Sequence, residues 1–89
     1  MKIITIIAMF LPCAKIYLFG SRARGDYKRG SDIDIAIDNK VKIDLVALQQ
    51  IRNMIECLNL IQNVDVIDFH AVPQELQQNI LKDGILWKK

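Results

Sequence analysis

The sequence predicts an α/β domain, closer to the α+β class, in which a small mixed sheet is flanked by helices. Two segments, residues 3–10 and 43–60, carry apolar residues at helical spacing. Residues 32–38 alternate strictly between polar and apolar side chains, as a half-buried strand does. The chain has 89 residues, the size of one domain, so we expect residues 1–89 to share a single core.

The first expected helix, residues 3–10, has one apolar face and ends before Pro12. Lys2 and the apolar run behind it also resemble the start of a secretion signal. The run is too short to span a bilayer, which takes about 20 residues. The Pro-Cys-Ala sequence at 12–14 is a poor cleavage site. We therefore expect a buried amphipathic helix in a cytoplasmic protein.

Two strands follow this helix. Residues 15–19 are rich in aromatic and β-branched side chains, which is typical of a short strand. The polar connection Gly20–Gly30, expected to be a turn with one helical turn inside it, leads to the strand at 32–38. A helical crossover needs about a dozen or more residues. This connection is too short for one, so the two strands are predicted to be antiparallel.

The second half of the chain adds a helix from about Ile43 to Leu60 and a strand at 64–69. A further helix has Pro73 in its first turn, and residues 85–87 are expected to form a last edge strand. The apolar stripe predicted for the long helix comprises Leu45, Leu48, Ile51, Met54, Ile55 and Leu58.

Composition limits the function classes. The chain is 52% hydrophobic and carries a net charge of +2, which is too small to indicate wholesale nucleic-acid binding. Cys13 and Cys57 lack metal-ligand spacing and are expected to be buried thiols. The only histidine, His70, is expected at a strand end or on the surface. We expect no second domain over the sheet or the Met54–Leu58 stretch, and therefore expect apolar surface left over for a partner or a second copy.

Asp32 and Asp34 carry the strongest chemical signal. Side chains two residues apart on a strand point to the same face. Two adjacent carboxylates repel each other unless water, a shared proton or a cation relieves them. Magnesium fits because it takes carboxylates and phosphate oxygens together. A solvated edge strand would explain an isolated Asp-x-Asp pair, but here the pair lies in an otherwise apolar strand, which makes plain exposure less favourable.

Gly20 and Ser21 follow the first strand directly. A turn of this composition presents backbone N–H groups and a hydroxyl that can hold an anion, and glycine lets a phosphate approach closely. Residues 20–30 hold four basic residues and one acidic residue, a local charge of +3, and Arg22 and Arg24 are the basic residues nearest the turn. Such charge suits a triphosphate and its leaving pyrophosphate.

A third carboxylate is expected on the strand at 64–69, where Asp65 and Asp68 lie among apolar residues. The two positions differ by an odd number, so their side chains point to opposite faces of the strand. Only one of them can join Asp32 and Asp34. The residues alone do not choose between them.

These motifs together resemble the signature of the DNA polymerase β-like nucleotidyltransferase superfamily, and most closely its minimal nucleotidyltransferase branch. The family pattern is Gly-Ser, ten residues, then Asp-x-Asp, which Gly20-Ser21 and Asp32-Ile33-Asp34 match with that spacing. The family places its third carboxylate between hydrophobic residues of a later strand, and this implies Asp65. The resemblance covers about Ala14 to Trp87, although the N-terminal helix looks shorter than is usual.

The resemblance implies the nucleotidyltransferase fold and a two-magnesium mechanism, with both ions on Asp32, Asp34 and Asp65. It implies that ATP is the substrate, that Gly20 and Ser21 hold its outer phosphates, and that Arg22 or Arg24 stabilises the pyrophosphate. Asp65 is then the candidate to accept the proton of the acceptor hydroxyl.

The same branch implies a partner protein of the HEPN type, in a toxin–antitoxin pair. The nucleotidyltransferase would be the antitoxin and would adenylylate a tyrosine of the toxin. Two alternatives stay open. One is transfer to a small molecule such as an aminoglycoside, and the other is a partner-binding antitoxin without catalysis. The sequence gives neither the base preference nor the oligomeric state.

Overall fold

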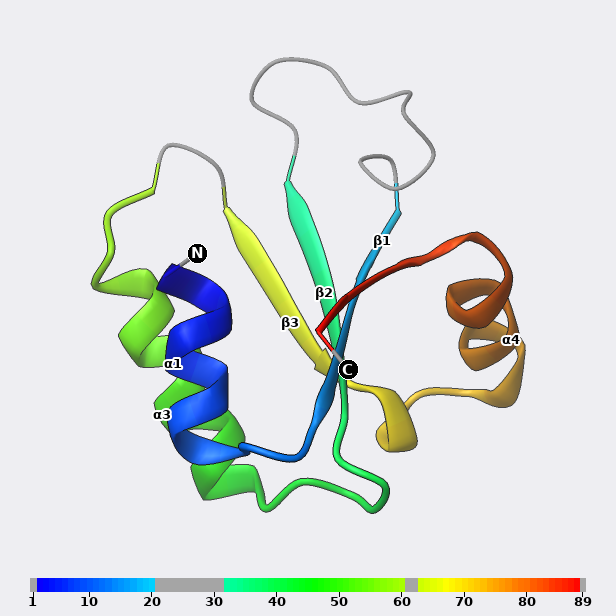
Figure 1. Cartoon of the computed structure of the whole chain (residues 1–89), viewed down its shortest axis with the longest axis horizontal. Helices are drawn as coiled ribbons and strands as arrows, with labels where there is room; N and C mark the ends of the chain where they lie inside the picture. The colour runs from blue at the N-terminus through cyan, green and yellow to red at the C-terminus, as the bar shows by residue number, and fades with distance from the viewer. Residues whose placement is uncertain (1, 21–31, 61–62, 89) are drawn as a thin grey trace.

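The computed structural model contains a single four-stranded sheet with helices on both of its faces (Figure 1). The structure describes residues 2–20, 32–60 and 63–88. The expected turn at 20–30 lies, apart from Gly20, outside these residues. The elements are α1 (Lys2–Phe10), β1 (Lys15–Phe19), β2 (Ile33–Asp38), α3 (Leu45–Glu56), β3 (Val64–Asp68), the 3₁₀ turn η1 (Phe69–Ala71), α4 (Gln74–Asp83) and β4 (Ile85–Lys88).

The strand order is β3-β2-β1-β4, and the sheet is mixed as predicted. β1 and β2 are antiparallel, with Phe19 opposite Asp34, which confirms the prediction from the short connection. β2 and β3 are parallel because α3 provides the crossover between them. β4 is antiparallel to β1 and forms one edge, as expected of residues 85–87.

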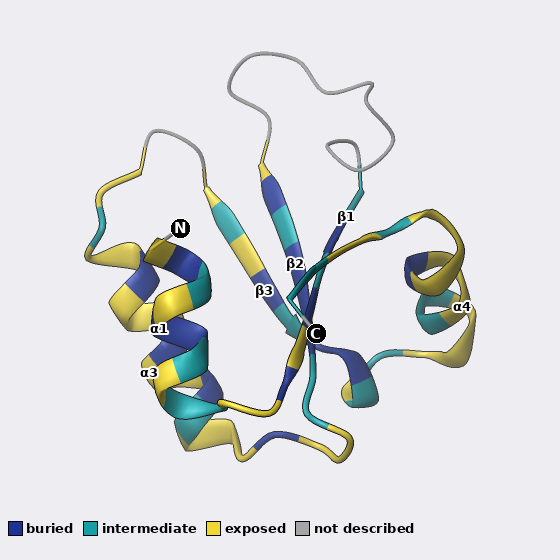
Figure 2. Ribbon diagram, viewed as in Figure 1, coloured by how far each residue is buried: buried dark blue, intermediate teal, exposed yellow. Residues whose placement is uncertain are grey.

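Each face of the sheet is covered by a different set of helices (Figure 2). α1 and α3 lie against the face that carries the odd-numbered residues of β2, and the larger core cluster fills this layer. α4 and η1 lie on the opposite face, where Ala36, Phe69 and Ile80 form a smaller cluster. The largest fully buried side chains of the larger cluster are Ile3, Ile7, Ile16, Ile35, Ile37, Ile51 and Val66. The fold therefore leaves the even-numbered side chains of β2 on the α4 face.

The long helix is shorter than the sequence predicted. Ile43 is buried but precedes α3, because its amide donates to the Asp68 carboxylate at 2.8 Å and holds it outside the helix. At the other end Asn59 adopts a left-handed conformation, φ 52°, which terminates a helix. The predicted burial of Leu45 and Met54 was wrong, since they are 79% and 38% exposed. Only Leu48, Ile51 and Ile55 of the stripe are buried in α3.

Some apolar surface is left uncovered, as the composition indicated. An apolar groove of about 470 Å³ lies where α1 meets the end of α3, and Ile6, Met54 and Leu58 contribute to its wall. Cys57 also lines it, and both Cys57 and Cys13 are exposed and free, so the expectation of buried thiols was wrong. Among the described residues no helix is long and apolar enough to cross a membrane.

Asp38, at the end of β2, forms a polar anchor with the turn after β3. Its carboxylate accepts from the Lys40 amide at 2.9 Å and lies 2.5 Å from Nε2 of His70. His70 is in η1, directly after β3, which confirms its expected place at a strand end. Burial alone would raise the pKa of Asp38, but the Lys40 amide, His70 and Lys15 together lower it below its usual value of 3.8.

We expect Asp38→Asn to lower the free energy of unfolding at neutral pH by about 1–2 kcal/mol, since a charge-assisted contact is lost. The folded-state pKa lies below the unfolded value, so the wild-type contribution is complete above pH 3.8 and is lost as the pH falls through the folded pKa. Urea unfolding on either side of pH 3.8 should show the gap between wild type and variant closing in acid. A gap that widens in acid would contradict this.

Candidate active site on β2 and β3

Asp34 and Asp65 meet at neighbouring positions of the sheet. β2 and β3 are parallel, and their register pairs Asp34 with Asp65. The flanking residues Ile33, Ile35 and Val66 point into the core beneath α1 and α3. Side chains alternate along a strand, so both carboxylates lie on the opposite face. Asp34 is half-buried and Asp65 is exposed.

Gly20 lies directly beside Asp34, just after the end of β1. Its φ of 75° is in the left-handed region, where a side chain is strained. A Cβ placed on Gly20 would come closer than 3.0 Å to Oδ2 of Asp34. The sequence had suggested glycine for the approach of a phosphate. The structure shows a second reason, because the Asp34 carboxylate occupies the space a side chain would need.

The other predicted residues fall into two groups. Asp32 is exposed and immediately precedes β2, two positions from Asp34. Ser21, Arg22 and Arg24 lie outside the described residues, so their predicted roles stay predictions.

Asp65 and Asp68 have different environments. Asp68 is 5% exposed, and its two oxygens accept from the amides of Ile43 at 2.8 Å and His70 at 3.1 Å. These bonds tie the segment before α3 to the turn after β3, which is a structural role. Asp65 has its side chain on the face that carries Asp34. Geometry therefore favours Asp65 over Asp68 as the third carboxylate of the candidate site.

The carboxylates of the candidate site could bind a metal ion only if a substrate supplied further oxygen ligands. Within residues 2–20, 32–60 and 63–88, no group of three or more His, Cys, Asp or Glu side chains is gathered closely enough to hold a metal ion. Magnesium, however, is usually bound through one or two carboxylates plus substrate phosphates. Asp34 and Asp65 provide two such oxygen donors on adjacent strands, so the residues present fit the ion when phosphate completes its shell.

Electrostatics also favour a cation here. Neighbouring strands are about 4.8 Å apart. Two unit charges about 5 Å apart repel by about 1 kcal/mol in water and about 3 kcal/mol near a protein surface. Like charges at paired positions of neighbouring strands repel each other, and a bound cation would relieve that repulsion.

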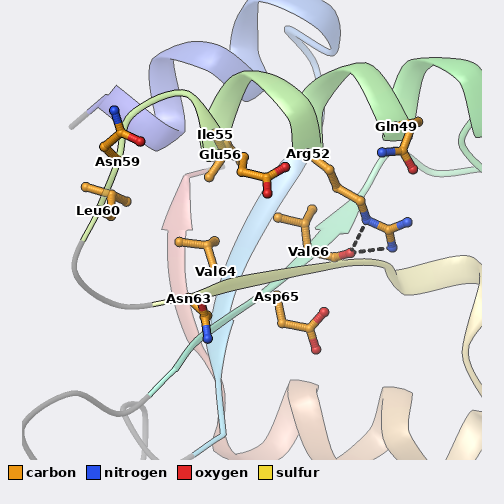
Figure 3. A pocket seen from close by; sticks show the side chains of 10 residues that line it. All are labelled: Gln49, Arg52, Ile55, Glu56, Asn59, Leu60, Asn63, Val64, Asp65 and Val66. Atoms are coloured by element: carbon orange, nitrogen blue, oxygen red, sulfur yellow. Dashed lines mark hydrogen bonds between the residues drawn. The ribbon is translucent and has the colours of Figure 1, made fainter.

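A polar groove adjoins Asp65 (Figure 3). It has a volume of about 500 Å³ and lies between α3 and β3. On its α3 side, Arg52 donates from Nε and Nη2 to the Val66 carbonyl, at 3.0 and 2.6 Å. Sequence reasoning missed Arg52, because its partner is a backbone carbonyl 14 residues away and leaves no pattern in side-chain types. Asp65 lies on the other side of the strand in this view.

Comparison with known proteins decides the family. The family model for polymerase beta nucleotidyltransferases matches residues 1–88. The chain belongs to this nucleotidyltransferase family. The resemblance drawn from Gly20-Ser21 and Asp32-Ile33-Asp34 is thereby confirmed, as is the expectation of an enzyme of this class.

One similar protein and two similar solved structures give a more specific comparison than the family model. The chain is 28% identical, over 88% of its length and 68% of the relative's, to a probable protein adenylyltransferase MntA of Haemophilus influenzae. A crystal structure of a toxin–antitoxin complex with AMP-PNP contains a chain that matches 99% of this one, with 31% identity and a TM-score of 0.79. A structure of a tri-AMPylated Shewanella oneidensis HEPN toxin with its MNT antitoxin matches at 27% identity and a TM-score of 0.73.

The nucleotidyltransferase covers 72% and 68% of the matched chains in these two structures. The matched region includes the whole sheet and the candidate site. These neighbours confirm the mixed α/β fold predicted from the sequence.

Proposed function

We propose that this nucleotidyltransferase moves AMP from ATP onto a hydroxyl of a HEPN-type toxin, a tyrosine, and so acts as the antitoxin of the pair. The observation that carries the proposal is the register that sets Asp34 beside Asp65, next to Gly20. The similar proteins support the choice of substrate, since one is named a protein adenylyltransferase and another is bound to an AMPylated HEPN toxin.

In this proposal, ATP binds at the turn that follows β1. Gly20 lies just after the end of β1, beside the Asp34 carboxylate, and the Gly20-Ser21 amides and the Ser21 hydroxyl hold the outer phosphates. Arg22 and Arg24 add positive charge where pyrophosphate leaves. These roles rest on the motif and its spacing.

Two magnesium ions bound by Asp32, Asp34, Asp65 and phosphate oxygens would supply Lewis-acid stabilisation at both ends of the displacement. Asp34 is held against Gly20, which orients its carboxylate. Asp65 takes the proton of the acceptor hydroxyl. The hydroxyl oxygen bonds to the α-phosphorus as the bond from that phosphorus to pyrophosphate breaks.

Isotopic labelling tests the reaction class. The protein is incubated with a HEPN-type toxin, magnesium, and ATP labelled at either the α- or the γ-phosphorus. We expect label on the partner from the α-position only, with release of pyrophosphate. Label from the γ-position would indicate a kinase. Label on an added aminoglycoside and none on the partner would favour the small-molecule alternative, and no label anywhere would favour a binding antitoxin without catalysis.

A further inference from the structure

The outer edge of β3 presents backbone groups that no described strand pairs. β3 is at the edge of the strand order. The carbonyl of Asn63 faces β2, where it accepts from the Ile33 amide at 2.9 Å. Backbone groups alternate in direction along a strand, so those of Val64 and Val66 face outward. Arg52 reaches the outward carbonyl of Val66, which is consistent with this direction.

The groove of about 500 Å³ follows this edge. Its wall on α3 includes Gln49 and Glu56, and amide side chains recur along it at Asn59 and Asn63 (Figure 3). Amide side chains both donate and accept hydrogen bonds, so they suit a peptide backbone.

The charges of the groove argue against a nucleic acid. Arg52 contributes one positive charge and Glu56 one negative charge, and the Asp65 carboxylate lies on the other side of the strand (Figure 3). Binding of a phosphate backbone depends on an excess of Lys and Arg, which this surface lacks. An extended peptide needs no such excess, because main-chain hydrogen bonds to an open sheet edge supply much of its affinity.

We infer that this groove binds the acceptor-bearing segment of the partner protein as an extended peptide along the outer edge of β3. The inference rests on the proposed function and deepens it, because it gives the acceptor an entry route. Asp65 belongs to the carboxylate pair and its position on β3 lines the groove, while its carboxylate lies on the opposite face of the strand (Figure 3). Side chains of an extended segment alternate between the two faces, so a segment lying along the edge would bring a side-chain hydroxyl on that face to the group that takes its proton.

Gln49 and Gln50 provide a matched pair of test positions. They are neighbours of the same type on α3 and both are exposed, but only Gln49 lines the groove. We expect Gln49→Trp to weaken binding of the HEPN-type partner by about 10-fold or more, the loss typical of a blocked contact region. Gln50→Trp should leave partner binding unchanged, and both variants should bind ATP as the wild type does. Equal partner affinity of the two variants would overturn the inference.

Photo-crosslinking locates the bound segment and separates the two proposals. With a photo-reactive residue at position 49, the crosslink should map to a partner peptide that contains the modified hydroxyl, and position 50 should give none. A crosslink to a distant part of the partner would overturn the inference while AMP transfer still supported the proposed function. A partner that crosslinks at position 49 yet gains no AMP would contradict the proposed function and leave the docking site supported.

Discussion

Replacing Asp34 by Asn should lower AMP transfer by about 10³-fold or more, because several kcal/mol of transition-state stabilisation are lost with one carboxylate of the pair. The same change removes one of two negative charges in register, so the fold should be equally stable or slightly more so. Single-turnover kinetics and thermal melts in chelator measure the two effects.

Asp38→Asn is the matched control for this variant. Asp38 lies on the same strand and the same face as Asp34, but its carboxylate is engaged by Lys40 and His70. The Asp38→Asn variant should be less stable than the wild type but should still transfer AMP, which is the opposite of what we expect for Asp34→Asn. If Asp34→Asn instead melts well below the wild type, the carboxylate is structural and the catalytic interpretation loses its main support.

Gly20→Ala should have the second-largest effect. A residue other than glycine at φ 75° is strained, by about 1–2 kcal/mol. The new Cβ would also collide with Oδ2 of Asp34, so the carboxylate must move. Because small displacements of a catalytic group are costly, we expect transfer to fall by about 10²-fold. Thermal unfolding and transfer kinetics check the two parts.

A double-mutant cycle distinguishes the collision from the strain. If Gly20→Ala acts through the Asp34 side chain, its destabilisation should shrink in an Asp34→Ala background, giving a coupling energy between the two sites. Backbone strain alone would be the same in both backgrounds. Additive effects would therefore contradict the role of Gly20 in positioning Asp34.

Much of the sheet could be predicted because its signals are local. Strict alternation marked β2, and the short connection to it required an antiparallel partner. The two-residue spacing of Asp32 and Asp34 and the odd spacing of Asp65 and Asp68 follow from strand geometry. The pairing of Asp34 with Asp65 is not local, because it depends on the register of two strands separated by α3.

The errors have tertiary causes. The sequence predicts a helix that begins at about Ile43, yet a bond to Asp68, 25 residues away, keeps Ile43 outside α3. Met54 has helical spacing but lies at the open groove near α1. Burial of such residues depends on which neighbour covers them, and periodicity alone does not supply that information.

Intact-mass spectrometry of the co-expressed HEPN-type partner tests most directly the claim that the carboxylates of β2 and β3 transfer AMP. With the wild-type protein, the partner should gain the mass of one or more AMP groups. The gain should persist with Asp38→Asn and vanish with Asp34→Asn and Asp65→Asn. A partner that gains the same mass beside folded Asp34→Asn and Asp65→Asn variants would contradict the account.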